Sequence, residues 1–200
     1  MDSAKIQLSP KEMELLTNAE WILTKNKIIE KTKSMFGGFQ DQAVAHLSRN
    51  GQNEFMAKPP KLSKGENYLG LPYLVLDYPR IFEKIDVLAI RSLFWWGNFF
   101  STTLHLSGRY KIRFEQDCIG AYELFCDNNF SICINTDPWQ HHFGDENYVL
   151  ASQIDQEEWT DFISGRTFLK IARKFSLVEW NNAAERLLEN FKTLTQILQL

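Results

Sequence analysis

Hydrophobic and polar positions along the 200-residue chain divide it into helical, strand and loop segments. The motif Ser9-Pro10-Lys11-Glu12 is typical of a helix start, since Ser9 can cap the helix and Glu12 can complete a capping box. Apolar residues then recur at helical spacing until Gly37-Gly38, which is typical of a helix end. We therefore predict a helix over residues 10–35, a shorter one over residues 40–49, and a buried face that holds Leu15, Ala19, Ile22, Leu23 and Ile29.

Residues 87–108 carry the densest concentration of apolar and aromatic side chains. Gly97-Asn98 lies between two β-type runs and is a two-residue turn signal, because glycine accepts the positive φ of a tight hairpin. This turn predicts that Trp96 faces Phe99 and that Ile90 faces His105, with Arg91 on the opposite face of the hairpin. The aromatic tip needs a cover, which is either helices of the same chain or a partner.

The remaining apolar pattern predicts strands and helices on both sides of this hairpin. Residues 119–136 are ambiguous, because short apolar runs fit either a helix or a hairpin, and we favour a hairpin over 121–136. The other predicted elements are a strand at 68–78, a helix at 109–118, a short strand at 148–151, a helix from Asp155 to about 163, a helix through Phe168, Ile171 and Ala172, and a final helix after Ser176.

A polar segment at residues 50–67 shows no periodicity and contains three lysines, Lys58, Lys61 and Lys64. Structureless loops longer than about 12–15 residues are uncommon in compact domains unless they are functional or disordered. The segment is therefore either a lid or anion-contacting loop, or a solvated crossing on the surface.

These elements predict one α+β domain over residues 1–200, with a mostly antiparallel sheet around the central aromatic hairpin. The sheet region spans about 68–151, and N-terminal helices (about 10–49) and C-terminal helices (about 155–199) pack on one face of it. The hydrophobic fraction of 44% is ample for a packed core. A net charge of −3 argues against a general nucleic-acid binder.

The three cysteines, Cys118, Cys126 and Cys133, are odd in number and lack CxxC spacing. This pattern favours reduced thiols of a cytosolic protein over a disulfide framework. The N-terminal sequence has no apolar run of signal-peptide length, and no window approaches the roughly 18 uncharged apolar residues of a membrane span. The sequence therefore predicts a soluble, cytoplasmic protein with no membrane or nucleic-acid partner.

Residues 139–146, WQHHFGDE, form the sharpest local candidate for chemistry. His141, His142 and Asp145 are candidate ligands for zinc or another divalent cation, because imidazoles and carboxylates are ligands for such ions. Adjacent histidines in an extended segment point to opposite sides, and the spacing matches no defined metal template. The alternative is a pair of surface or half-buried histidines bonded to backbone, and no other cofactor is evident.

Two residues of the hairpin are further candidates. His105 is a candidate general base beside hydroxyl residues of its predicted face, with Asp77 as the orienting carboxylate, and the alternative is a satisfied core histidine. Arg91 lies among apolar residues, so it needs either a carboxylate such as Asp77 or Glu83, or an anionic ligand in a pocket between sheet and helices.

Trp95 and Trp96 could belong to a ligand pocket or a protein interface, because aromatic residues dominate binding hot spots. Core packing is the alternative, since rings usually find partners in their own domain. The candidate ligand-binding residues are therefore Arg91, Trp95, Trp96 and His105.

The runs ENYLGLPYLVLDYPR and FWWGNFFSTTLHLSG, with the later DPWQHHF loop, resemble an uncharacterised family of bacterial hypothetical proteins of about this length. The resemblance covers most of the chain and implies a bacterial, cytosolic protein. The family carries no known activity, ligand or catalytic residue to transfer.

Two functions fit these features. The first is a non-catalytic module that binds a small ligand or a protein partner, with a homodimer as one form of association. The alternative is a metal-assisted hydrolase or related enzyme that uses the His141, His142 and Asp145 loop. Both remain hypotheses from the sequence alone.

Overall fold

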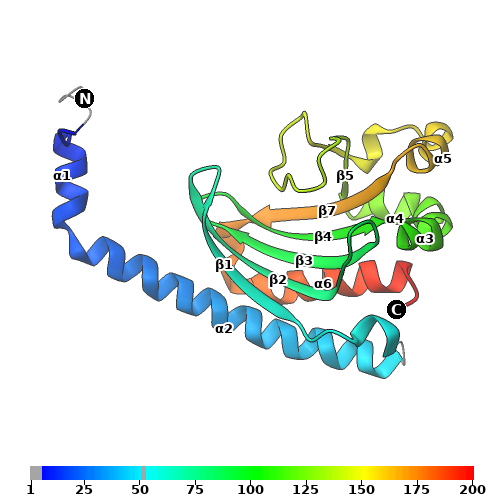
Figure 1. The fold of residues 1–200 in the computed structure, drawn as a ribbon, viewed down its shortest axis with the longest axis horizontal. Helices are drawn as coiled ribbons and strands as arrows, with labels where there is room; N and C mark the ends of the chain where they lie inside the picture. The colour runs from blue at the N-terminus through cyan, green and yellow to red at the C-terminus, as the bar shows by residue number, and fades with distance from the viewer. Residues whose placement is uncertain (1–5, 51–52) are drawn as a thin grey trace.

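A seven-stranded sheet lies at the centre of the computed structural model, which describes residues 6–50 and 53–200 (Figure 1). Its order is β1-β2-β3-β4-β7-β5-β6, and the pairings between the described strands are antiparallel. Residues 51 and 52 of the polar segment lie outside the described residues, as do residues 1–5. The strands are β1 (Lys61–Tyr68), β2 (Leu71–Phe82), β3 (Val87–Trp95), β4 (Phe99–Ser107), β5 (Ser131–Cys133), β6 (Tyr148–Leu150) and β7 (Phe168–Ser176).

Two long helices cover one face of this sheet, so the fold is α+β as the sequence predicts (Figure 1). The helices α2 and α6 pack against each other, α2 also packs against β2, and α6 packs against β4. Within the described residues, no helix combines the length and apolar composition needed to cross a bilayer. The helices are α1 (Pro10–Thr17), α2 (Ala19–Asn50), α3 (Arg109–Gly120), α4 (Tyr122–Asp127), α5 (Gln156–Ser164) and α6 (Ala183–Ile197), with short 3-10 turns at Asn53–Met56, Ala151–Gln153 and Leu177–Asn182.

The main core lies between the sheet and these helices. Phe191 of α6 stacks on Tyr78 of β2 with ring centroids 6.5 Å apart, and Phe39 of α2 meets Phe191 edge-on at 5.9 Å. Aliphatic residues of the central strands, such as Leu74 and Leu104, are fully buried on the same face. Burial of this apolar surface is the main force that holds the helices on the sheet.

The connection between β3 and β4 has three residues instead of the predicted two. Trp95 pairs with Phe99, so the predicted pairing of Trp96 with Phe99 is wrong by one residue. The amide of Asn98 donates to the carbonyl of Trp95 (3.1 Å), and Gly97 has a φ of 72°. Gly97 is the third residue of the β-turn from Trp95 to Asn98, and a type II turn needs a positive φ at this position, which glycine adopts without strain.

The shifted register changes which hairpin residues share a face. Ala89 pairs with His105, in place of the predicted Ile90. Because successive side chains alternate between the faces of a sheet, a one-residue slip moves a whole set of side chains to the other side. Arg91 and His105 therefore lie on the same face, the one that points away from α2 and α6.

The N-terminal helix breaks at Asn18 instead of running from residue 10 to 35. The predicted capping box is present, since the Ser9 amide donates to the Glu12 carboxylate (2.7 Å) and the Glu12 amide donates to Ser9 Oγ (3.3 Å). Asn18 ends α1, and its Oδ1 then accepts from the amides of Glu20 (3.1 Å) and Trp21 (3.4 Å). Such local side-chain bonds compete with a continuous helix and start a new one.

The second helix continues through Gly37-Gly38 to Asn50, so the predicted stop is wrong. Phe36 and Phe39 on either side of the glycines are buried in the core, and this packing outweighs the low helix propensity of glycine. Of the predicted buried face, Ile29 is buried, whereas the earlier residues Leu15, Ala19, Ile22 and Leu23 are exposed.

Three more segments differ from their predicted structures. Residues 61–68 form the edge strand β1, so the polar segment is not a loop throughout. Residues 122–127 form α4, so the helical reading holds where a hairpin was favoured. Residues 168–176 form β7 in place of a helix, because both faces of this strand are covered and its apolar residues do not alternate.

Candidate functional site

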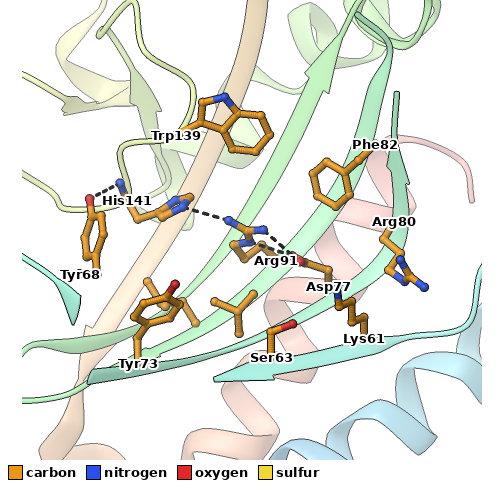
Figure 2. A pocket seen from close by; sticks show the side chains of 12 residues that line it. Lys61, Ser63, Tyr68, Tyr73, Asp77, Arg80, Phe82, Arg91, Trp139 and His141 are labelled. Atoms are coloured by element: carbon orange, nitrogen blue, oxygen red, sulfur yellow. Dashed lines mark hydrogen bonds and ion pairs between the residues drawn. The ribbon is translucent and has the colours of Figure 1, made fainter. Parts of the chain in front are cut away.

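A cavity of about 600 Å³ opens on the sheet face that points away from α2 and α6 (Figure 2). Strands β1, β2 and β3 form its floor, and the β5–β6 loop (residues 134–147) forms one wall. This volume suits a small molecule. The cavity is lined by Lys61, Ser63, Tyr68, Tyr73, Val75, Asp77, Arg80, Phe82, Arg91, Leu93, Trp139 and His141.

Two irregularities in strand register bring key residues onto this face. Asp77 and Arg80 are three positions apart, so a regular strand would direct them to opposite faces. The register between β2 and β3 shifts between these two residues, and the register between β1 and β2 shifts between Gly65 and Tyr68. Each extra residue reverses the alternation, so Arg80 and Tyr68 both turn into the cavity.

Arg91 on β3 lies at the floor of the cavity and is held from two sides. Its Nε donates to Oδ1 of Asp77 (2.7 Å), its Nη2 donates to Oδ2 (2.9 Å), and its Nη1 donates to Nε2 of His141 (2.9 Å) (Figure 2). Asp77 is thus the carboxylate that the sequence suggested for Arg91. A guanidinium has five N–H groups and these three bonds use three of them, so two remain for a ligand.

His141 is a neutral acceptor in this arrangement. Arginine has no acceptor atom, so the His141 nitrogen that faces Arg91 must be unprotonated, which places the ring proton on Nδ1. Burial lowers the pKa of His141 to about 2, and the positive charges of Arg91 and Lys170 act in the same direction. The imidazole therefore orients Arg91 without adding charge to the cavity at neutral pH.

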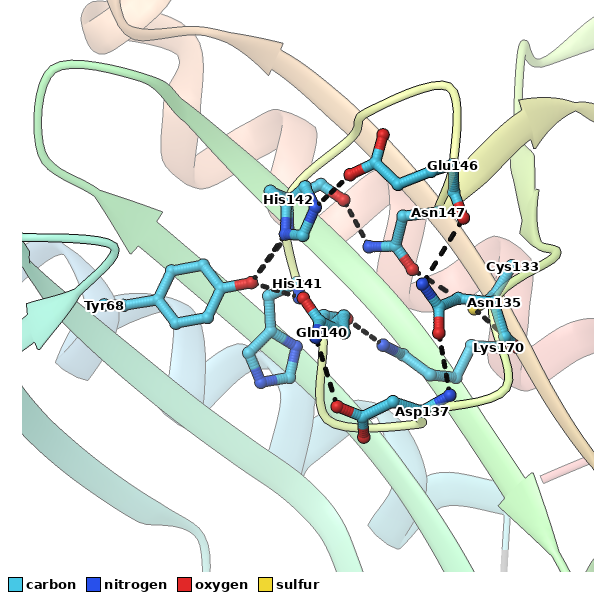
Figure 3. A network of polar contacts seen from close by, with 10 residues as sticks. All are labelled: Tyr68, Cys133, Asn135, Asp137, Gln140, His141, His142, Glu146, Asn147 and Lys170. Atoms are coloured by element: carbon cyan, nitrogen blue, oxygen red, sulfur yellow. Dashed lines mark hydrogen bonds and ion pairs between the residues drawn. The ribbon is translucent and has the colours of Figure 1, made fainter.

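Tyr68 fixes the β5–β6 loop to the edge of the sheet. Its hydroxyl accepts from the backbone amides of His141 (2.6 Å) and His142 (3.1 Å) (Figure 3). The same hydroxyl lies 3.0 Å from His142 Nδ1 and donates its proton there, while His142 Nε2 donates to Glu146 (2.6 Å). The phenol thus makes three hydrogen bonds, which hold the loop wall beside the cavity.

A polar network inside the loop keeps its shape (Figure 3). Asn147 is fully buried, and its amide donates to the His142 carbonyl and accepts from the Cys133 thiol (3.5 Å). Nearer the cavity, Gln140 Nε2 donates to Asp137 (3.2 Å). Because buried polar groups are costly when unpaired, these contacts make an alternative loop conformation unfavourable.

Two buried cationic or titratable residues lie beneath the loop. Lys170 of β7 is 1% exposed and its Nζ donates to the Gln140 carbonyl. Burial lowers the pKa of Lys170 to about 8. Burial also lowers the pKa of His105 to about 3, helped by the charges of Lys170 and Arg91. Trp139 covers His105, with ring centroids 5.6 Å apart.

Of the predicted ligand-binding residues Arg91, Trp95, Trp96 and His105, Arg91 is the one that lines the cavity. Trp95 is buried under Tyr68 and donates from Nε1 to its carbonyl (3.2 Å), so it supports the wall from behind. Trp96 packs edge-on against Phe94 on the helix-covered side. His105, the candidate catalytic base, is buried beneath Trp139 outside the cavity lining.

The candidate metal ligands His141, His142 and Asp145 lie in one loop, but the two imidazoles bond to different partners. His141 contacts Arg91, and His142 contacts Tyr68 and Glu146. In the part of the chain that the structure describes, no three His, Cys, Asp or Glu side chains gather in a metal-binding arrangement. A metal site at these residues stays a prediction from the sequence.

Several lining residues were not among the sequence candidates. Arg80 and Phe82 reach the cavity through the β2 irregularity, and Trp139 reaches it through the folding of the loop. One indication of this site was present in the sequence, because Lys61 belongs to the lysine cluster that suggested an anion-contacting segment. This lysine contributes from a strand and not from a lid.

Comparison of the chain with family models, with curated proteins and with solved structures finds no match.

Proposed function

We propose that the protein is a non-catalytic module that binds a small organic anion in the Arg91 cavity. The observation that carries this proposal is the placement of Arg91 at the cavity floor, oriented by Asp77 and His141, with two N–H groups left over. Arginine held in a fixed orientation suits a carboxylate or phosphate group, which accepts two parallel hydrogen bonds.

The charges of the cavity favour an anion. Lys61, Arg80 and Arg91 line it, and Asp77 is the one carboxylate among the lining residues. Asp77 is already engaged by Arg91. Within the described residues Lys61 and Arg80 form no salt bridge, and Arg80 Nε donates to the backbone carbonyl of Pro59 (2.7 Å). An anionic group would therefore meet positive charge that forms no salt bridge among the residues that the structure describes.

Aromatic side chains on the walls favour a ligand with a flat apolar part. Tyr68 and Tyr73 lie edge-on to each other at one end (6.2 Å between centroids), and Phe82 and Trp139 face each other across the other end (6.3 Å). Pockets for small molecules combine such apolar walls with a few convergent polar groups. An aromatic carboxylate or aryl phosphate matches both features.

The hydrogen bonds of the site favour binding over catalysis. Nε2 of His141 is occupied by Arg91, and the Tyr68 hydroxyl already makes three bonds. A general base or nucleophile needs a free lone pair directed at the substrate. The polar groups at this cavity therefore serve to position Arg91 and the loop.

Isothermal titration calorimetry with benzoate and phenyl phosphate tests the proposal, with benzamide as the uncharged control. We expect saturable one-to-one binding of the anions that weakens as salt is added, and no binding of benzamide. Arg80→Gln and Lys61→Gln should each weaken binding about threefold to tenfold, because each removes one uncompensated charge.

Lys31→Gln is the matched control, since it removes an exposed lysine on α2, which lies on the other side of the sheet. An Arg91→Gln, Asp77→Asn double variant removes the anchoring group without leaving one buried charge unpaired, and it should abolish binding. Equal binding of benzamide and benzoate, or no loss of affinity in the Arg80 and Lys61 variants, would rule the proposal out.

A further inference from the structure

The first part of α2, with α1 at its end, projects beyond the edge of the sheet (Figure 1). We call residues 10–24 the arm. The arm lies away from the Arg91 cavity and carries a set of exposed apolar side chains, several of them about half exposed or more. They are Met13 (48%), Leu15 (43%), Leu16 (70%), Trp21 (49%), Ile22 (50%) and Leu23 (57%).

The apolar face of the arm continues a face that is buried farther along the same helix. Ile29, Phe36 and Ala43 follow Ile22 at intervals of seven residues, and all three are buried against the body. The salt bridge from Lys25 to Glu66 (3.0 Å) lies at the point where this contact with the body ends. The helix therefore presents to solvent a stripe of the kind that it buries elsewhere.

We propose that the arm binds the arm of a second copy of this chain, in an antiparallel, two-fold arrangement. The exposed apolar side chains offer roughly 600 Å² of apolar surface on one copy, so two copies would bury an area near the lower bound of a stable interface. Three consecutive residues of the arm are apolar, Trp21, Ile22 and Leu23, and their side chains leave the helix in different directions. A partner helix that packs along the arm therefore covers more of them than a flat surface does.

The charges around the arm fit an antiparallel pairing. The free end is acidic on balance, since it carries three glutamates and one lysine (Glu12, Glu14, Glu20 and Lys11). The end that joins the body is basic on balance, since it carries two lysines and one glutamate (Lys25, Lys27 and Glu30). Antiparallel association places the acidic free end of one arm beside the positively charged end of the other, where that arm joins its body. Parallel association would place like charges together. The segment from 10 to 30 has three lysines and four glutamates, which is unlike the basic helices that lie on membranes.

Sedimentation equilibrium of the full chain, over a wide range of concentration, tests the association. We expect a reversible shift from 23.4 kDa to twice that mass. Ile22→Glu should weaken the association at least about tenfold, because it places a charge in the apolar contact. Ile112→Glu is the control, since Ile112 is 77% exposed on α3, away from the arm, and it should leave the association unchanged.

A charge-reversal experiment tests the antiparallel arrangement. Glu14→Lys alone and Lys27→Glu alone should each weaken the association, because each creates like charges across the interface in both halves of the dimer. An equimolar mixture of the two variants should restore it, because every facing pair is then of opposite sign. Circular dichroism checks that both exposed substitutions leave the fold intact.

Three outcomes would overturn the proposal. One is a wild-type chain that stays at 23.4 kDa at all concentrations. The second is an equal effect of Ile22→Glu and Ile112→Glu, and the third is a mixture of charge variants that associates no better than each alone. None of these outcomes depends on the ligand of the Arg91 cavity.

Discussion

Arg91 and Asp77 form a two-point ion pair between directly opposed positions of β3 and β2, with Nε–Oδ1 and Nη2–Oδ2 distances of 2.7 Å and 2.9 Å. The carboxylate is buried and the guanidinium is largely buried, so each ion depends on the other for its charge balance. The pair is therefore both a structural element and the anchor of the proposed anion site.

Asp77→Ala should lower the free energy of unfolding by about 2–4 kcal/mol, because it leaves a mostly buried guanidinium without its carboxylate. Urea denaturation followed by circular dichroism measures the change. The double variant Arg91→Met, Asp77→Leu should regain most of the stability, since apolar residues of similar volume often replace a buried pair at little cost. A double variant as unstable as Asp77→Ala would contradict this explanation.

Tyr68→Phe should loosen the β5–β6 loop, because the lost hydroxyl holds the amides of His141 and His142. We expect amide hydrogen exchange at residues 141 and 142 to become at least about tenfold faster, and the global stability to fall by about 1–2 kcal/mol. Tyr73→Phe is the matched control, since this second tyrosine lines the same cavity and has no such bond to the loop among the described contacts. Unchanged exchange in Tyr68→Phe would contradict the assigned role of the hydroxyl.

Stability should fall as the pH drops below about 6.5, the pKa of an unfolded histidine. Burial lowers the pKa of His105 to about 3 and that of His141 to about 2, so both stay neutral in the folded state while the unfolded chain takes up protons. The stabilisation is thus complete above pH 6.5 and is lost toward pH 3.

Between pH 7 and pH 5 each of these histidines should cost about 1–2 kcal/mol of unfolding free energy. Urea titrations at the two pH values measure the loss. His105→Asn should remove the share of the pH dependence that belongs to His105, about 1–2 kcal/mol between pH 7 and pH 5, whatever its effect on stability at pH 7. A pH dependence identical to that of the wild type would show that His105 titrates normally in the fold.

Thr102 and Thr103 form a natural pair for testing buried hydroxyls. In the described part of the chain the Oγ1 of Thr102 is buried without a hydrogen-bond partner, whereas Thr103 bonds to the Tyr148 hydroxyl. Thr102→Val should therefore raise the free energy of unfolding by about 1 kcal/mol, and Thr103→Val should lower it by about 1 kcal/mol. Thermal and urea denaturation of both variants give the two signs.

The fold class and several element starts are visible in the sequence because they depend on local chemistry. The capping box at Ser9 is present, a helical segment begins after Ser176 as predicted, and the central aromatic hairpin lies where predicted. The segment at β7 was misassigned because a central strand is covered on both faces, which removes the alternation that distinguishes a strand from a helix.

The cavity was harder to predict because it depends on register. A third residue in the β3–β4 connection brings Arg91 and His105 onto one face, and the two shifts in β1 and β2 turn Tyr68 and Arg80 inward. Each of these changes comes from one extra residue in a strand or turn, and hydrophobic alternation does not reveal it. Asp77 could be predicted as a candidate partner of Arg91, because an arginine among apolar residues needs a carboxylate to balance its charge.

The cavity is built from two parts that contribute differently to the molecule. Asp77 and Arg91 stand on the hydrogen-bonded ladder of the sheet, while Trp139 and His141 belong to a loop that lies outside the main core. Substitution of an exposed loop residue such as Trp139 can therefore change the shape and chemistry of the entrance without disturbing the contact between the sheet and its helices. Under the proposed function, the exposed ring of Trp139 therefore sets ligand preference, while Asp77 and Arg91 supply a charged floor that the sheet holds in place.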